Sequence, residues 1–152
     1  MKLDNRGFTL IEVLVSVVIL SLLSIVTVSS VSSLTKKNNI KAYENLKNGI
    51  ISSSVIYMSD NRYDVVFDGI CISDTDLVNV TSVGNDTLFD SKILIKYLIN
   101  EGDLTTTSNG NIINPLDDSL VLDLNNSYVL VKYQCSTKDY VYTLEDDYLV
   151  WK

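Results

Sequence analysis

The sequence predicts an α+β protein in which a long amino-terminal α-helix packs on a carboxyl-terminal antiparallel β-sheet. Three observations lead to this prediction. An almost uncharged apolar stretch lies between Arg6 and Lys36, with Glu12 as its single charge. Apolar residues then recur at helical spacing over residues 35–60. The last quarter of the chain alternates Val- and Tyr-rich segments with polar turns, which is typical of paired strands.

Composition narrows the classes of function. The 152 residues include 19 acidic and 12 basic residues and no His, so the formal net charge is -7. An acidic chain is a poor ligand for a duplex phosphate backbone, so nucleic-acid binding is not expected. Without His, the chain cannot form a His-dependent catalytic triad. It also contains no phosphate-binding loop, dinucleotide fingerprint or nucleophile elbow. We therefore expect a protein that is not an enzyme and has no cofactor.

The apolar stretch has the length of a membrane span. Residues 13–34 would form roughly 33 Å of helix at about 1.5 Å per residue, which matches a hydrocarbon core of about 30 Å. Two basic residues precede the stretch and two follow it, so flanking charge does not fix its orientation. A core helix fits poorly because the segment is apolar around most of its circumference. A membrane anchor and a secretory signal peptide both fit this pattern.

Glu12 is the anomaly within this stretch. A charge at the centre of a membrane costs about 2.5–3.5 kcal/mol, and less near the end of a span, where the side chain can reach the interface. A solvated surface carboxylate is the ordinary interpretation. The alternative is a cationic partner: cleavage after Gly7 would give Phe8 a new terminal amine, four residues from Glu12 on a similar side of the helix. Among identical packed helices, that amine could meet a neighbour's Glu12.

Residues 6–15, RGFTLIEVLV, resemble the amino-terminal signature of type IV pilins and of the pseudopilins of type II secretion and competence systems. The resemblance implies that a prepilin peptidase removes the leader, residues 1–7, by cutting between Gly7 and Phe8, and that it methylates Phe8. It also implies assembly with other pilin or pseudopilin subunits into a helical filament. In that filament Glu12 pairs with the terminal amine of a neighbour.

The resemblance also predicts a location and a type of subunit. The precursor would be a single-pass protein of the cytoplasmic (inner) membrane, and the assembled subunit would lie in an extracellular filament or on the cell surface. Major pilins commonly carry Pro where this sequence has Ser29, so a minor pilin or pseudopilin is favoured. The alternative is a filament-tip or surface-binding subunit, such as an adhesin or a DNA-uptake protein. A secreted enzyme released by signal peptidase fits less well.

Four segments follow from this interpretation. Residues 1–7 are the leader, 8–34 the hydrophobic transmembrane and assembly helix, 35–60 its amphipathic continuation, and 61–152 an extracellular globular α+β domain. The continuation carries an apolar stripe expected to face the sheet, made of Ile40, Tyr43, Leu46, Ile50 and Tyr57.

In the globular domain the patterns predict strands and one short helix. The helix is expected over residues 92–99, between a capping Asp-Ser pair and a Gly. The expected strands are 63–67, 70–72, 120–124, 128–135, 140–144 and 148–151, the last three forming an antiparallel meander. The Tyr residues in these strands are expected to pack on a half-buried face, and a role in binding sugars or bases is not expected.

Two cysteines and several acidic turns are candidates for special chemistry. Cys71 and Cys135 can form a disulfide in an extracellular domain, although two buried free thiols are the alternative. The acidic turns contain oxygen ligands of the kind that Ca²⁺ prefers, but they lack EF-hand spacing, so solvated turns and no metal site are expected. These turns hold Asp74 and Asp76, Asp117 and Asp118, and Glu145, Asp146 and Asp147.

Overall fold

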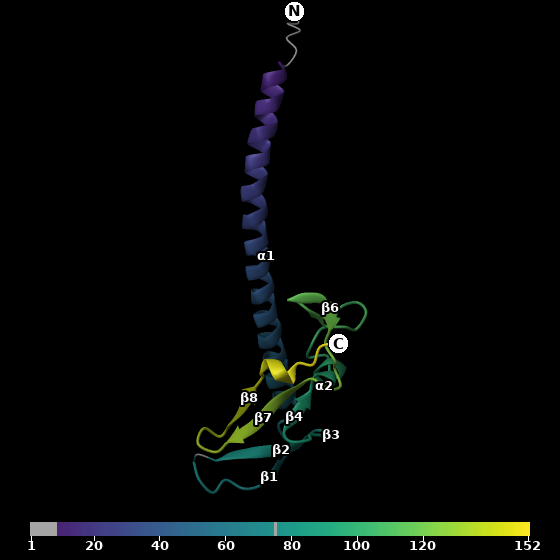
Figure 1. Cartoon of the computed structure of the whole chain (residues 1–152). Helices are drawn as coiled ribbons and strands as arrows, with labels where there is room; N and C mark the ends of the chain where they lie inside the picture. The colour runs from purple at the N-terminus through teal and green to yellow at the C-terminus, as the bar shows by residue number, and fades with distance from the viewer. Residues whose placement is uncertain (1–8, 75) are drawn as a thin grey trace, which may run out of the picture. The chain divides into compact units, whose positions relative to one another are not determined.

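The computed structural model describes residues 9–74 and 76–152, apart from the side chains of residues 25–30. A long amino-terminal helix is followed by an antiparallel β-sheet, which confirms the predicted α+β class (Figure 1). The chain divides into two compact units, Met1–Asn39 and Ile40–Lys152.

The described part of the first unit contains the amino-terminal part of helix α1, which spans Leu10–Asp60. Neither Pro nor Gly occurs between Phe8 and Asn48, so nothing in the sequence interrupts the helical hydrogen bonds there. The described apolar side chains of this unit are exposed, with exposed fractions from 48% at Val15 to 89% at Leu10. Among the residues that the structure describes, no helix is both long and apolar enough to cross a membrane.

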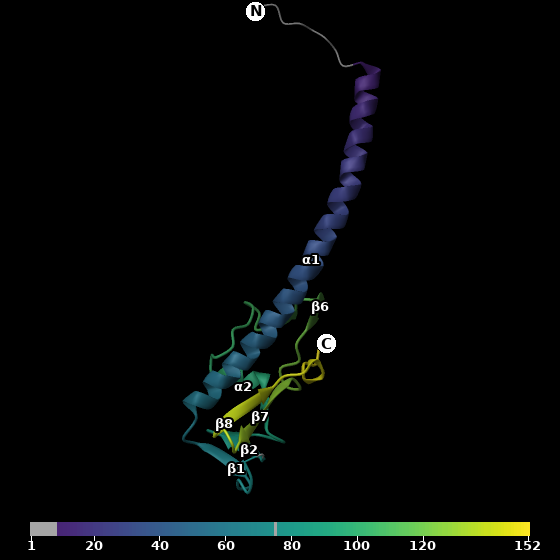
Figure 2. The ribbon, with the colours of Figure 1, turned by 90° about the vertical axis from the view of Figure 1, so that its left-hand side faces the viewer.

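The second unit is built on the carboxyl-terminal part of α1. Ile50, Tyr57 and Met58 of this part are at most 1% exposed and belong to one hydrophobic core with the sheet. The predicted stripe is thus correct at its carboxyl-terminal end, whereas Ile40 is 43% exposed. Figure 2 shows β7 and β8 beside the last turns of α1.

Within the described residues the main sheet has six strands, and a second sheet has two. The main sheet contains β1 (Val65–Asp68), β2 (Leu77–Val83), β3 (Asp86–Thr87), β4 (Lys92–Leu94), β7 (Tyr128–Gln134) and β8 (Asp139–Thr143). The smaller sheet contains β5 (Ile113–Asn114) and β6 (Asp117–Val121). A short helix α2 (Ile95–Asn100) follows β4, and a 3₁₀ turn (Asp146–Tyr148) follows β8.

Strand β7 lies at the centre of the main sheet. Lys132 pairs with Asn79 of β2 and with Val141 of β8, so these two strands lie on opposite edges of β7. Strand β4 pairs with β7 further along the edge that β2 occupies. Val129 and Val131 of β7 are fully buried in the core. Their burial fixes the register, because a slip by one residue would expose both.

Two polar contacts fasten the sheet and the following turn to α1. The Tyr57 hydroxyl donates a hydrogen bond to the Asp86 carboxylate at 2.7 Å and lies 3.4 Å from the carbonyl oxygen of Val83. The Lys47 ammonium forms an ion pair with Asp146 of the 3₁₀ turn at 2.7 Å. Both contacts lie within the second unit, so α1 is held there by polar groups as well as by the apolar core.

Several expected elements differ from the observed ones. Residues 92–94 form β4 instead of the first turn of a helix, because they pair with Tyr128–Leu130 of β7, and the helix begins at Ile95. Residues 70–72 form no strand, and the unpredicted β2 supplies the partner of β1. The region around 120–124 contributes β6 to the smaller sheet.

The end of the chain differs from prediction in the same way. Residues 148–151 do not form a meander strand, since a 3₁₀ turn occupies Asp146–Tyr148. Trp151 makes only an isolated bridge with Leu122. The predicted strands 128–135 and 140–144 are confirmed as β7 and β8.

Candidate functional site

The amino terminus of α1 is closed by a reciprocal cap between Thr9 and Glu12. The Thr9 backbone N–H and hydroxyl each donate a hydrogen bond to Glu12 Oε2 at 2.8 Å. In return the Glu12 backbone N–H donates to Thr9 Oγ1 at 3.4 Å. The carbonyl of Thr9 accepts the first helical bond, from the N–H of Val13. This is a capping box, which satisfies backbone donors that a helix start otherwise leaves unpaired.

The polar side chains along the apolar part of α1 hydrogen-bond inside the helix. Ser16, Ser21 and Ser24 donate their hydroxyls to the carbonyls four residues earlier, at 2.7, 2.8 and 2.8 Å. Thr35 does the same at 3.0 Å. A hydroxyl bonded in this way needs no water, so these residues suit a helix whose surroundings are apolar.

Apolar side chains point outward around the described turns of this helix. Every residue from Leu10 to Ser24 is exposed, and the apolar ones among them range from 48% exposure at Val15 to 89% at Leu10. Exposed apolar surface of this extent marks a site of contact with protein or lipid. Because the exposed residues lie around the whole circumference, a single flat partner would cover only part of them.

The predicted processing positions, Gly7 and Phe8, lie outside the described residues. Glu12, the predicted assembly residue, lies within them, in the first turn of α1. Its carboxylate is engaged by Thr9, a partner that the sequence interpretation did not consider.

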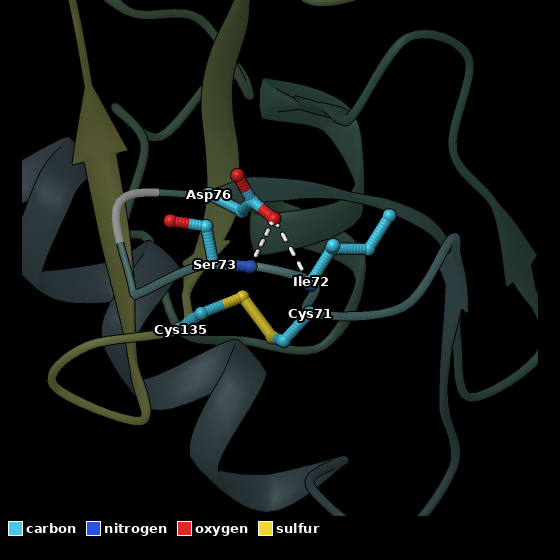
Figure 3. Close-up of a disulfide and its surroundings, with 5 residues drawn as sticks. All are labelled: Cys71, Ile72, Ser73, Asp76 and Cys135. Carbon is cyan, nitrogen blue, oxygen red and sulfur yellow. Dashed lines mark hydrogen bonds between the residues drawn. A yellow bond between two sulfur atoms is a disulfide. The ribbon is translucent and has the colours of Figure 1, made fainter.

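Cys71 and Cys135 are joined by a disulfide, with their Cα atoms 5.8 Å apart (Figure 3). The bond ties the loop after β1 to the end of β7. Asp76 braces the same loop: its carboxylate accepts backbone N–H bonds from Ile72 at 3.0 Å and from Ser73 at 2.7 Å. Its carbonyl accepts the N–H of Cys135 at 3.1 Å. The disulfide and these hydrogen bonds together fix the described part of the loop.

The acidic turns serve local structure. The Asp117 carboxylate accepts two hydrogen bonds from Ser119, and these bonds lower the pKa of Asp117. Asp146 is paired with Lys47, and that hydrogen bond lowers the pKa of Asp146. Among the described residues, no three His, Cys, Asp or Glu side chains are grouped so that they could hold a metal ion.

A capped, apolar amino-terminal helix followed by an antiparallel sheet gives the chain an α+β, pilin-like arrangement. Residues 2–28 match the family model of the prokaryotic N-terminal methylation motif, which is the type IV pilin and pseudopilin signature. This match supports a pilin-like or pseudopilin subunit, and the motif implies a membrane-anchored precursor that becomes part of a surface filament. No curated protein and no solved structure matches the chain significantly.

The sequence contained signals for two features that the sequence interpretation missed. Thr9-Leu10-Ile11-Glu12 has the Thr-x-x-Glu spacing of a capping box directly before an apolar run. In a helix, a serine hydroxyl can donate to the carbonyl four residues earlier, so the serines of the apolar stretch could have been expected to form hydrogen bonds within the helix.

Proposed function

We propose that this chain is a structural subunit of a type IV pilus or a related pseudopilus filament, and more narrowly a minor pilin or pseudopilin. The observation that carries the proposal is the methylation motif of residues 2–28, of which residues 10–28 lie on the capped helix α1, with exposed apolar side chains from Leu10 to Leu23. The activity is assembly, and it involves no catalytic turnover.

Before assembly, residues 8–34 hold the precursor in the cytoplasmic membrane, and residues 61–152 lie outside it. The internal hydrogen bonds of Ser16, Ser21 and Ser24 support this, since hydroxyls in lipid need partners within the helix. The disulfide between Cys71 and Cys135 supports the outer location, because such bonds persist in oxidising compartments.

A prepilin peptidase then hydrolyses the Gly7–Phe8 peptide bond. Gly7 leaves as the carboxylate end of the leader, and Phe8 acquires a free amine, which the same enzyme methylates. The capping box survives this cut, because the Thr9 N–H and hydroxyl both belong to the mature chain. The mature helix therefore starts with the Glu12 carboxylate already fixed in position.

In the filament, the Phe8 amine of one subunit pairs with Glu12 of another. A carboxylate has two oxygens and about four acceptor positions, so two bonds from Thr9 to Oε2 leave capacity for an amine. Helices packed through their apolar faces exclude water, and an unpaired charge there would be strongly penalised. The pair therefore sets the register in which the helices associate.

The narrower assignment rests on the continuity of α1. Ser29 stands where major pilins commonly have Pro, and it lies within the helix. A Pro would remove a backbone hydrogen bond and allow local melting. A helix without this weak point favours a minor pilin or pseudopilin.

The test is incorporation of a Glu12→Ala subunit into filaments in the native cell. We expect membrane levels to stay unchanged and incorporation to fall by at least tenfold, because the Phe8 amine loses its partner. Glu44→Ala is the matched control, since Glu44 is an exposed carboxylate on the same helix, and it should assemble normally. Normal incorporation of Glu12→Ala would reject the pairing role.

A further inference from the structure

A hollow of about 320 Å³ opens beside β2 in the second unit, between the end of β1 and the segment that links β3 to β4. It lies where β2 separates from β7. Its polar and aromatic lining includes Asp68, Asn79, Thr81, Thr87, Phe89 and Asp90. The proposed filament function does not use this hollow.

The fold shapes the hollow through a buried serine. Ser91 is 1% exposed, and its hydroxyl accepts the Val80 N–H at 3.0 Å where β2 has left β7. Its carbonyl accepts the Val131 N–H at 2.9 Å. Asp90 and Ser91 both have positive φ, 51° and 61°, which L-residues rarely adopt. This anchored bend turns the preceding residue, Phe89, outward.

Phe89 is the unusual group at the rim. Its side chain is 83% exposed, whereas Val80 and Leu88, which also line the hollow, are 0% and 4% exposed and belong to the hydrophobic core. An exposed aromatic ring at the rim of a hollow offers a flat surface to the apolar face of a ligand. A volume of about 320 Å³ is at the lower end for small-molecule sites, roughly 300–1,000 Å³, and suits a single ring.

The local charges favour a neutral ligand. Asp90 lies 3.5 Å from the Lys92 ammonium. Asp68, Asn79 and Lys132 form one cross-strand row over β1, β2 and β7. Val78 and Val80, on either side of Asn79, are buried, so this row lies on the face of the sheet opposite the core. The two carboxylates of the lining, Asp68 and Asp90, are matched by two ammonium groups just outside it, Lys92 and Lys132, so the net charge around the hollow is close to zero.

We infer that the hollow binds a neutral hexose residue of a glycan. A pyranose ring has an apolar C–H face that can stack on Phe89 and hydroxyls that can donate to Asp68 and exchange hydrogen bonds with Asn79. Thr81 and Thr87 add side-chain hydroxyls at the rim. The hollow would bind a cation or an anion poorly, because the net charge around it is close to zero.

The test is a titration of the full-length protein with methyl glycosides of glucose, galactose, mannose, N-acetylglucosamine and N-acetylgalactosamine, followed by saturation-transfer NMR. The protein is kept in dodecylphosphocholine micelles, because maltoside detergents carry sugar headgroups that would compete with the glycosides for the hollow. We expect at least one glycoside to bind, and Phe89→Ala to weaken that binding at least fivefold. Tyr63→Ala is the matched control, since Tyr63 is also 83% exposed but does not line the hollow.

A second pair of variants tests the polar contacts. Asp68→Asn should weaken the same glycoside at least threefold, whereas Asp74→Asn, which alters an exposed carboxylate outside the hollow, should leave it unchanged. Such a sugar could come from a cell-wall polysaccharide or from a host mucin. Comparing the binding of the protein to each of these two polymers distinguishes the two sources.

Two outcomes would overturn the inference: no binding of any glycoside in the panel at millimolar concentration, or equal binding by Phe89→Ala and the wild type. Neither outcome affects the filament proposal, which depends on Glu12 and the amino terminus. Conversely, failed assembly of the wild-type subunit would leave the sugar titration unchanged.

Discussion

The hydroxyl of Tyr57 allows the junction between α1 and the sheet to be tested quantitatively. Tyr57 is 1% exposed, and its hydroxyl donates to the Asp86 carboxylate at 2.7 Å. Burial, followed by the hydrogen bond to Asp86, raises the pKa of Tyr57, so the phenol is protonated and remains a donor at neutral pH. Tyr57→Phe removes this donor and leaves the packing of the ring in place.

The expected loss can be estimated from this geometry. A hydrogen bond to a charged group contributes about 1.5–3 kcal/mol, and Asp86 is partly exposed, so water can recover part of its solvation. We therefore expect Tyr57→Phe to lower the free energy of unfolding by about 1.5–2 kcal/mol. For a unit of this size that corresponds to a fall in Tm of roughly 6–8 °C.

The assay is urea and thermal unfolding of the full-length protein in micelles, followed by near-ultraviolet circular dichroism. Tyr63→Phe is the matched control, because it removes a hydroxyl from a side chain that is 83% exposed, and it should change Tm by less than about 1 °C. A double-mutant cycle with Asp86→Asn should give a coupling energy of about 1 kcal/mol. Unchanged stability of Tyr57→Phe, or equal losses in both Tyr variants, would refute the reasoning.

Three further predictions concern the cross-link, the ion pair and the cap. Replacing both Cys71 and Cys135 by Ser should cost about 2–4 kcal/mol, because the bond closes a loop over 64 positions; a reductant that leaves Tm unchanged would contradict this. Asp146→Asn should cost less than about 1 kcal/mol, since Asp146 is 71% exposed. The Lys47 hydrogen bond lowers the pKa of Asp146 and raises that of Lys47. The ion pair should therefore stabilise the fold fully between the ordinary carboxyl and lysine pKa values, and its contribution should decrease below and above them. If the free energy of unfolding of Asp146→Asn had the same pH profile as that of the wild type, this prediction would be contradicted. Thr9→Ala should destabilise the first turn of α1 by about 1 kcal/mol, whereas Thr9→Ser should not, because Ser keeps the capping hydroxyl. Amide hydrogen exchange of the first turn measures this difference. Equal exchange rates in the two variants would count against the cap.

The sequence patterns predicted the long helix and the main hairpin because those signals are local. The Gly- and Pro-free stretch specifies α1, and the β-branched and aromatic run of residues 128–134 specifies β7. Strand β2 was missed because Asn79 and Ser82 interrupt its apolar residues and because one of its partners, β7, lies far along the chain. Similarly, only pairing with β7 makes residues 92–94 extended.

The candidate site was predictable in its residue types but not in its geometry. The pattern around Glu12 predicted a carboxylate in need of a partner, and the structure supplies Thr9 from within the same helix turn. The hollow beside β2 could not be predicted, because Asp68, Asn79 and Phe89 meet only after β1, β2 and the bend at Asp90 have formed. Residues that are joined by tertiary structure alone leave no spacing signal in the sequence.

The most direct measurement is the intact mass of the protein purified from native membranes. We expect a chain that starts at Phe8, with residues 1–7 removed and the mass of one methyl group added at the new amine. An unprocessed chain, or one cleaved beyond residue 34, would contradict this expectation.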